Sequence, residues 1–170
     1  MAIRTVGVVG SGQMGNGIAQ VAACCGMEVT MVDIKQEFLD RGTSAISHSL
    51  DKLVSKERMS QQEADSALSR ISSSTELESL SGCDLVVEAI PEIPELKYST
   101  FSKLDSICKP QAILASNTSS ISINEIARHT NRPDRVIGMH FMNPVPVMAL
   151  VELIRSIATD DETYTTVNNV

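Results

Sequence analysis

Residues 6–20 of the chain read VGVVGSGQMGNGIAQ, and residues 29–33 read VTMVD. The first stretch starts as a short apolar strand, turns through Gly10, Gly12 and Gly15 in the spacing G-x-G-x-x-G, and continues as a helix. In this spacing the first glycine permits a tight turn, the second lets a pyrophosphate approach the backbone, and the third lets the helix pack closely on the strand. The N-terminus of the helix offers free N–H groups to the phosphates. This order of elements predicts a dinucleotide-binding unit.

Asp33 strengthens this prediction. It closes the second strand roughly 20 residues after the glycines, where a carboxylate can accept hydrogen bonds from the ribose hydroxyls of an adenosine. The alternative, a glycine turn with a purely structural role, is disfavoured by the strand, the helix and the acid around it. The same carboxylate should repel the 2′-phosphate of NADP, so NAD is the expected cofactor, although Lys35 could soften that preference.

The bulk composition is that of an ordinary globular domain. The 170 residues are 42% hydrophobic and 21% charged, which suits one domain with a full core. The net charge is −7 with no basic tract, so neither nucleic acid nor an anionic membrane is an expected partner. No apolar run approaches the roughly 20 residues of a membrane-spanning helix. The first residues lead straight into a strand, so we expect no secretory or transit peptide and a cytoplasmic or organelle-matrix location, with peroxisome and mitochondrion both open.

The four cysteines give no sign of a disulfide framework or a metal site. Cys24, Cys25, Cys83 and Cys108 form no C-x-x-C pair and show no metal-ligand spacing with the three histidines. We expect buried, reduced thiols, with Cys24 and Cys25 on the packed side of the first helix, and a reducing compartment.

Beyond residue 33, apolar strands alternate with amphipathic helices. The expected strands are residues 84–90, 112–115, 135–141 and 148–154, the last of them more exposed than the others. The expected helices are residues 36–56, 60–68, 94–107 and 123–129, the second of them begun by a capping box of Ser60 and Glu63. Such alternation predicts an α/β fold with a Rossmann-like, doubly wound, mostly parallel sheet, in a single domain over residues 1–158.

Residues 159–170 carry a separate expectation. Thr159 and Glu162 have the spacing of a capping box, which predicts a helix from Asp160 to Val170. A helix that begins so near the last residue suggests that it is cut short. We therefore interpret residues 159–170 as the start of a truncated helix that leads to a further domain.

His140 is the candidate for a general base among the three histidines. It stands at the carboxyl end of an expected buried strand, where open α/β sheets place their ligands, whereas His48 and His129 lie on expected helix surfaces. The alternative is a core histidine with a purely structural role. Glu152, on the following strand, could hold one ring nitrogen. A carboxylate buried beside a histidine is unfavourable unless the two are paired, so contact between them would favour a functional role.

The segment SNTSS, residues 116–120, follows another strand at the same expected edge of the sheet. Serine and asparagine clusters often only cap helices, and that alternative stays open for Ser116 and Ser120. Ser119 is the more informative hydroxyl, because a substrate oxygen between it and His140 would receive two hydrogen bonds.

Four segments together resemble a known family: GSGQMGNGIAQ (residues 10–20), DLVVEAIPE (84–92), SNTSSISI (116–123) and GMHFMNPVPVMALVE (138–152). They are similar to the NAD-binding domain of the short-chain 3-hydroxyacyl-CoA dehydrogenases, which include 3-hydroxybutyryl-CoA dehydrogenases. The resemblance runs from Val6 to about Ile154. A related β-hydroxyacid or 6-phosphogluconate-type dehydrogenase would share the glycine pattern, but those enzymes lack the HFMNP segment.

The resemblance implies roles for individual residues. It makes His140 the catalytic histidine, Glu152 its partner and Ser119 a contact to the substrate and cofactor. The implied cofactor contacts are Gly10, Ser11, Gly12, Gln13, Met14, Gly15, Asp33, Glu92, Lys97, Ser119 and Asn143. The implied contacts to coenzyme A are Ser49, Lys56 and Ser119, although a polar stripe on a long helix is more often a solvated face. No metal is implied.

The implied activity is the NAD-dependent oxidation of the 3-hydroxyl of a short-chain 3-hydroxyacyl-CoA to the 3-ketoacyl-CoA, in fatty-acid metabolism. Members of the family continue into an all-helical domain that closes the active site, supplies a further catalytic asparagine and makes most of a homodimer interface. No such domain is expected within these 170 residues. The alternative function is therefore a truncated NAD-binding module with little or no turnover. Pro91 also departs from the aliphatic residue that the family often has there.

Overall fold

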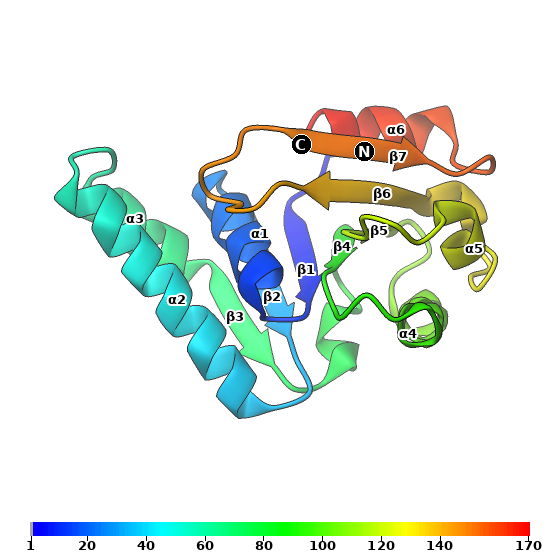
Figure 1. Cartoon of the computed structure of the whole chain (residues 1–170), viewed down its shortest axis with the longest axis horizontal. Helices are drawn as coiled ribbons and strands as arrows, with labels where there is room; N and C mark the ends of the chain where they lie inside the picture. Colours follow the sequence, from blue (N-terminus) through cyan, green and yellow to red (C-terminus); the bar gives the residue numbers. More distant parts are fainter. Residues whose placement is uncertain (1) are drawn as a thin grey trace.

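The computed structural model describes residues 2–170, which form one seven-stranded sheet with helices on both faces (Figure 1). The strands are β1 (Thr5–Val9), β2 (Glu28–Val32), β3 (Ile71–Ser74), β4 (Leu85–Glu88), β5 (Ile113–Ser116), β6 (Val136–Phe141) and β7 (Val151–Arg155). Their order is β3-β2-β1-β4-β5-β6-β7, and every neighbouring pair is parallel except β6 and β7. The predicted doubly wound, mostly parallel sheet is confirmed.

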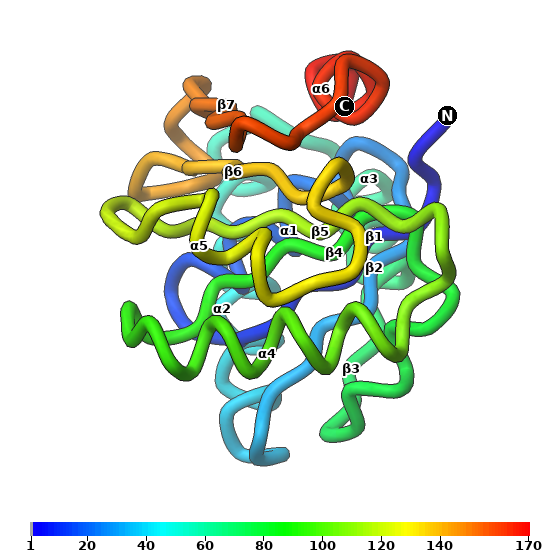
Figure 2. The backbone as a smooth tube through the Cα atoms, turned by 90° about the vertical axis from the view of Figure 1, so that its right-hand side faces the viewer, coloured from blue at the N-terminus to red at the C-terminus, as the bar shows by residue number. Residues whose placement is uncertain are grey.

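The helices divide between the two faces of the sheet. They are α1 (Gln13–Cys24), α2 (Gln36–Ser55), α3 (Gln61–Ser69), α4 (Pro94–Ile107), α5 (Ile123–Ala127) and α6 (Asp161–Asn168), with the 3₁₀ turns η1 (Leu77–Leu80) and η2 (Pro133–Arg135). In Figure 2, α4 and α5 lie in front of the strands, while α1, α2 and α3 lie behind them. Both faces are therefore covered, as a parallel sheet requires.

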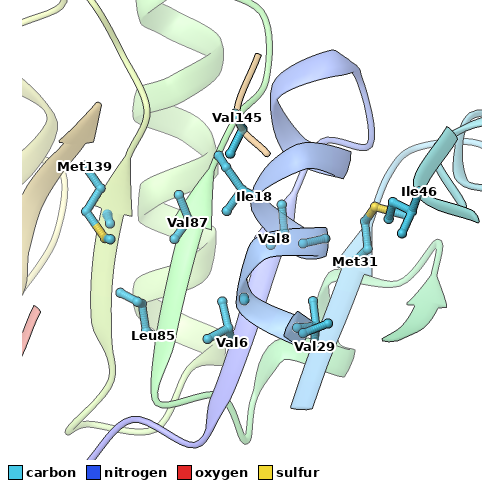
Figure 3. Close-up of a cluster of buried hydrophobic side chains, with 14 of the residues drawn as sticks. Val6, Val8, Ile18, Val29, Met31, Ile46, Leu85, Val87, Met139 and Val145 are labelled. Atoms are coloured by element: carbon cyan, nitrogen blue, oxygen red, sulfur yellow. The ribbon is translucent and has the colours of Figure 1, made fainter. Parts of the chain in front are cut away.

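Successive residues of β1 pack into opposite layers. Val6 and Val8 join the cluster beneath α1, together with Ile18 of that helix (Figure 3). Val9 joins the cluster on the α4 side. Each of these valines is less than 9% exposed, and burying such a side chain contributes about 1.5–3 kcal/mol. The apolar run that the sequence shows at this point is thus explained by burial on both faces.

The sheet topology fixes where a ligand can bind. β1 lies between β2 and β4. The chain therefore adds β2 and β3 on one side of β1 and then crosses to add β4 on the other side. The glycine turn follows the carboxyl end of β1, and the loop that starts at Ala89 follows the carboxyl end of β4. Open α/β sheets bind ligands at this switch point. The fold therefore places residues 10–15 and 89–93 side by side at the ligand edge.

Three elements were not predicted: β3 and the two 3₁₀ turns, η1 and η2. β3 has the sequence ISSS, and η1 has the sequence LESL. β3 is an edge strand that pairs with β2 along its whole length, so backbone hydrogen bonds hold it without an apolar face. A strand held in this way leaves no hydrophobic periodicity for a sequence pattern to detect.

The prediction for two of the cysteines is wrong. Cys83 and Cys108 are buried as expected, but Cys24 and Cys25 are exposed. Cys24 is the last residue of α1 and Cys25 is its C-cap, so both lie past the part of the helix that packs on the sheet. Burial, followed by the neighbouring Cys108, raises the pKa of the Cys83 thiol to about 11, which keeps it protonated at neutral pH.

The last helix begins one residue later than predicted, and another side chain caps it. Asp160 is the N-cap of α6 and accepts a hydrogen bond of 2.6 Å from the backbone N–H of Thr163. Thr159 instead donates to the carbonyl of Val136, 2.7 Å away, so the predicted capping box is wrong. By contrast, the predicted capping box of Ser60 and Glu63 is present at the start of α3.

The last strand is also shorter than predicted at its start. β7 begins at Val151, whereas residues 148–150 belong to the loop that follows β6. That loop crosses the start of α1, where a Cβ on Gly17 would lie 2.8 Å from Cβ of Val145. The helix predicted over residues 123–129 likewise ends earlier, at Ala127.

The stability of the fold at low pH should depend on Asp84, which lies just before β4. Burial raises the pKa of Asp84, but hydrogen bonds from Lys109 and from the backbone of Arg4 and Thr5 outweigh burial and lower the pKa to about 2 from 3.8. The carboxylate therefore stabilises the fold fully above pH 3.8, and this contribution is lost as the pH falls towards 2. We expect Asp84→Asn to lower the free energy of unfolding at pH 7 by on the order of 1–2 kcal/mol. Urea unfolding at pH 7 and at pH 3 checks this: the gap between the variant and the wild type should be clearly smaller at pH 3, and an equal gap at both would contradict it.

Candidate functional site

The glycine turn has room for a ligand at one position only. A Cβ on Gly10, where φ is +98°, would lie 2.7 Å from the carbonyl oxygen of Ala89, and a Cβ on Gly15 would lie 1.7 Å from the carbonyl oxygen of Gly10. Both of these glycines are therefore required by the protein itself. A Cβ on Gly12 would meet nothing within 4 Å. The absence of a side chain at Gly12 leaves open space above the turn, as a closely approaching pyrophosphate needs.

The N-terminus of α1 is left uncapped. Gly12 is its N-cap and makes no side-chain hydrogen bond to the helix, and no acidic residue lies in the first turn. The starts of α3 and α6 are capped by Ser60 and Asp160. The first N–H groups of α1 are thus available to an anion, together with the positive end of the helix dipole.

Asp33 is fixed beneath the glycine turn. Its Oδ2 accepts hydrogen bonds from the backbone N–H and the hydroxyl of Ser11, both 2.7 Å away, and its Oδ1 accepts one of 2.7 Å from the N–H of Ile34. A carboxylate oxygen has two acceptor positions, so Oδ1 keeps one free for a ribose hydroxyl. The buried Ser11, predicted as a cofactor contact, is shown here holding Asp33. Lys35 lies with its ammonium 5.6 Å from the ring centroid of Phe38.

These features fit NAD. The open space at Gly12 and the uncapped α1 adjoin the free acceptor of Asp33, because Asp33 is hydrogen-bonded to Ser11 of the glycine turn. Gln13 connects the glycine turn to the loop that follows β6, because its side-chain amide donates a hydrogen bond of 3.1 Å to Oδ1 of Asn143. The predicted residues at the glycine turn and Asn143 are thus brought together.

His140 and Glu152 meet across two neighbouring strands. They are directly opposite each other in the antiparallel register of β6 and β7, and Nδ1 of His140 lies 2.7 Å from Oε2 of Glu152. The side chain of His140 is 25% exposed and that of Glu152 is 53% exposed. The histidine is therefore not a core residue, and Glu152 is not buried. The bond at Nδ1 orients the ring and leaves Nε2 as its available nitrogen.

The pair opens onto a cavity of about 280 Å³. Its lining includes His140, Glu152, Ser119, Asn124 and Arg155. Ser119, which follows β5, is exposed, so its hydroxyl is accessible from the cavity. The structure thus brings together the three residues that were predicted to act in catalysis.

Glu92 supports the backbone of Ser119. Its Oε1 accepts hydrogen bonds from the hydroxyl of Thr118 and from the N–H groups of Ser119 (3.1 Å) and Ser120 (3.2 Å). Burial raises the pKa of the Glu92 carboxyl, but the Thr118 hydrogen bond and the charge of Lys97 outweigh burial and lower the pKa to about 2. Pro91 leaves this arrangement intact. Thr118 was not predicted from the sequence in this role.

Of the three predicted coenzyme A contacts, Ser119 lines the cavity, but Ser49 and Lys56 are not joined to it. Ser49 lies on α2 and Lys56 is the C-cap of that helix. Among residues 2–170, no hydrogen bond or ion pair links either of them to the residues around His140.

Residues 2–170 also bear on membrane insertion and on metal binding. None of the helices there combines the length and the apolar character that a membrane-spanning helix needs. No group of three His, Cys, Asp or Glu side chains there could hold a metal ion.

Known proteins are similar to this chain in sequence and in fold. The family described as "3-hydroxyacyl-CoA dehydrogenase, NAD binding domain" matches residues 5–170. A 3-hydroxybutyryl-CoA dehydrogenase of Bradyrhizobium diazoefficiens is 51% identical over 162 residues, which cover 95% of this chain and 55% of that protein. A probable 3-hydroxybutyryl-CoA dehydrogenase of Deinococcus radiodurans is 54% identical over 157 residues, which cover 92% of this chain and 56% of that protein.

A solved structure agrees with these relatives. The (S)-3-hydroxybutyryl-CoA dehydrogenase of Ralstonia eutropha superimposes with a TM-score of 0.97 at 49% identity, over 99% of this chain and 59% of that one. The chain thus spans little more than half the length of the relatives that it matches. The predictions of a Rossmann-like fold and of NAD as cofactor are confirmed. This chain belongs to the family of NAD-binding domains of 3-hydroxyacyl-CoA dehydrogenases.

Proposed function

We propose that this chain binds NAD and supplies the catalytic base for oxidation of the 3-hydroxyl of a short-chain 3-hydroxyacyl-CoA to the 3-ketone. The observation that carries the proposal is the contact of 2.7 Å between His140 and Glu152. It lies at the same edge of the sheet as the glycine turn, since β1 and β6 both end there. The names of the relatives from Bradyrhizobium diazoefficiens and Ralstonia eutropha support the substrate class.

The residues around the cavity can perform the proton chemistry. With its Nδ1–H donated to Glu152, His140 has an unprotonated Nε2 that can take the proton of the substrate hydroxyl. The Ser119 hydroxyl can donate a hydrogen bond to the same oxygen, because both side chains line the cavity. Glu152 then stabilises the imidazolium that forms. The glycine turn and Asp33 would hold NAD, which would supply the acceptor for the hydride of C3.

Other roles stay proposals. Glu92 and Asn143 are suited to contact the cofactor, because both adjoin the glycine turn or the Ser119 loop. Ser49 and Lys56 would contact coenzyme A only if the substrate extends along α2. The homodimer that the family resemblance implies is a further proposal. The four free cysteines support a reducing compartment.

A second function has its own supporting observation. Glu152 is 53% exposed, so the pair with His140 is in contact with solvent. Electrostatic stabilisation of a developing charge is much weaker in water than in a closed site. The chain would then be an NAD-binding module that holds the cofactor with little turnover.

One pair of measurements separates the two functions. Binding of NADH is followed by its fluorescence, and turnover by the oxidation of NADH with acetoacetyl-CoA. We expect this chain to bind NADH and to turn over slowly, because the pair at His140 is open to water. Brisk turnover would contradict the module, and absence of NADH binding would contradict both functions. Acetoacetate without coenzyme A is the control for recognition of the acyl-CoA.

A further inference from the structure

The side-chain amide of Asn117 connects the loop that carries Ser119 to the strand that carries His140. Asn117 directly follows β5 and lies two residues before Ser119. Its Oδ1 accepts a hydrogen bond of 2.9 Å from the backbone N–H of Phe141, the residue directly after His140. A backbone N–H can only donate, so the atom that faces it is the amide oxygen, and the bond fixes the orientation of the amide. Asn117 thus joins the two segments on which the proposed proton chemistry depends.

This side-chain bond lies where the pairing between β5 and β6 stops. The last pair between these two strands is Ser116 with Gly138, so residues 139–141 of β6 lie beyond the end of the ladder. On the other side, β6 stays paired with β7 up to Phe141, which lies opposite Val151. The end of β6 is therefore held by strand pairing on one side, and the Asn117 side chain supplies a hydrogen bond on the other.

The backbone of Asn117 is fixed by a separate contact. Its N–H donates a hydrogen bond of 2.8 Å to the carbonyl oxygen of Glu88, which ends β4. The next part of the loop is held from the chain that follows β4, since Oε1 of Glu92 accepts the N–H of Ser119 at 3.1 Å. Asn117 is therefore anchored at β4, and from this anchor its side chain can hold the end of β6 in place.

The surroundings of Asn117 favour an indirect role over contact with the substrate. Asn117 is half-buried and does not line the cavity of about 280 Å³, whereas Ser119 and His140 both line it. A misplacement of about 1 Å at a catalytic group can lower the rate by about 100-fold. The contact that holds the strand of His140 against the Ser119 loop can therefore affect the reaction without touching the substrate.

We infer that Asn117 is a positioning residue: by accepting the N–H of Phe141, its side chain sets the position of His140 relative to Ser119. Pairing of β6 with β7 places Glu152 beside His140, and the Asn117 bond adds the relation to the Ser119 loop. The inference rests on the proposed function, because the distance between Ser119 and His140 matters only if a substrate oxygen lies between them.

Two substitutions test the hydrogen bond itself. Asn117→Ala removes the acceptor, whereas Asn117→Asp keeps an oxygen that can accept the N–H of Phe141. With acetoacetyl-CoA, we expect Asn117→Ala to lower kcat by about 10–100-fold and to change KM by less than about threefold, because a displaced base affects the transition state more than substrate binding. Asn117→Asp should recover most of kcat. A change in KM alone, or equal losses of kcat in both variants, would overturn the inference.

A second readout measures the geometry directly and needs neither substrate nor cofactor. Crystal structures of the wild type and of both variants give the distance between Oγ of Ser119 and Nε2 of His140. We expect this distance to be the same in the wild type and in Asn117→Asp, and to differ in Asn117→Ala by more than the tolerance of a catalytic site, about 0.5 Å. An unchanged distance in Asn117→Ala would overturn the inference. If the wild type binds no NADH, the proposed function fails, but the crystal structures still decide whether Asn117 positions His140.

The matched control removes the same kind of acceptor at the other edge of the sheet. Oδ1 of Asp160 accepts the N–H of Thr163 at 2.6 Å, at the start of α6. This helix follows the end of β7 that points away from the ligand edge, because β7 is antiparallel to β6. Asp160→Ala should lower the thermal stability without changing kcat or the distance between Ser119 and His140. Comparable changes in this control would mean a general loosening of the fold, and the inference would be wrong.

Discussion

Replacing His140 by glutamine should lower turnover by orders of magnitude while leaving NADH bound. Removing a general base costs about 10²–10⁴-fold in rate, and we expect the loss of acetoacetyl-CoA-dependent NADH oxidation to fall in this range. Glutamine keeps the polar volume of the ring but cannot take up a proton at neutral pH. NADH affinity should stay within about threefold of the wild type, because the contacts at the glycine turn are untouched.

Two further variants make this result specific. Glu152→Gln keeps a hydrogen-bond acceptor near Nδ1 but removes the charge that stabilises the imidazolium, so its loss of rate should be smaller than that of His140→Gln. His129→Gln is the matched control: its Nδ1 is also hydrogen-bonded, 2.8 Å from the carbonyl oxygen of Glu125, but its ring stacks on Tyr98 away from the cavity. It should retain full activity. Equal activity of wild type and His140→Gln would refute the assignment of the base.

The sequence predicted those parts of the fold that leave a periodic or positional pattern. The buried strands β1 and β4 appear as continuous apolar runs, and the start of α3 appears as a capping box. The edge strand β3 was missed because backbone pairing with β2 holds three consecutive serines in place. The exposure of Cys24 and Cys25 was missed because a helical stripe does not show where the helix runs past the sheet.

The functional site, too, could be predicted only where its residues are close together in the sequence. The glycine turn and Asp33 are local in sequence, so their spacing was enough to predict them. The contact of His140 with Glu152 could only be suggested, because it depends on the register of β6 against β7. Glu88 was missed altogether, although a carboxylate within an apolar strand, nine residues before a lysine on a helix, is a signal for a buried pair. Its pairing with Lys97, at 2.6 Å, depends on the contact of a strand with a helix, which no local pattern describes.

Replacing Gly12 by alanine should strongly weaken NADH binding by a protein that folds normally. The added Cβ would meet nothing within 4 Å in the protein itself, so we expect no change in thermal stability beyond that of an ordinary exposed glycine. The methyl group would instead occupy the space where the pyrophosphate approaches the backbone of the turn. A loss of about 2.7 kcal/mol of binding free energy, or roughly 100-fold in affinity, is the expected result of a fluorescence titration with NADH.

Gly82→Ala is the control that separates ligand contact from the loss of a glycine. A Cβ on Gly82 would also meet nothing within 4 Å, and this residue lies just before β4, at the opposite edge of the sheet from the ligand site. The two substitutions add the same methyl group to the same kind of open space, so they should have similar effects on unfolding. Only Gly12→Ala should weaken NADH binding, because only at Gly12 is the open space needed by the cofactor. Equal NADH affinities for the two variants would show that the pyrophosphate does not approach the chain at Gly12, and the glycine pattern would then have only a structural role.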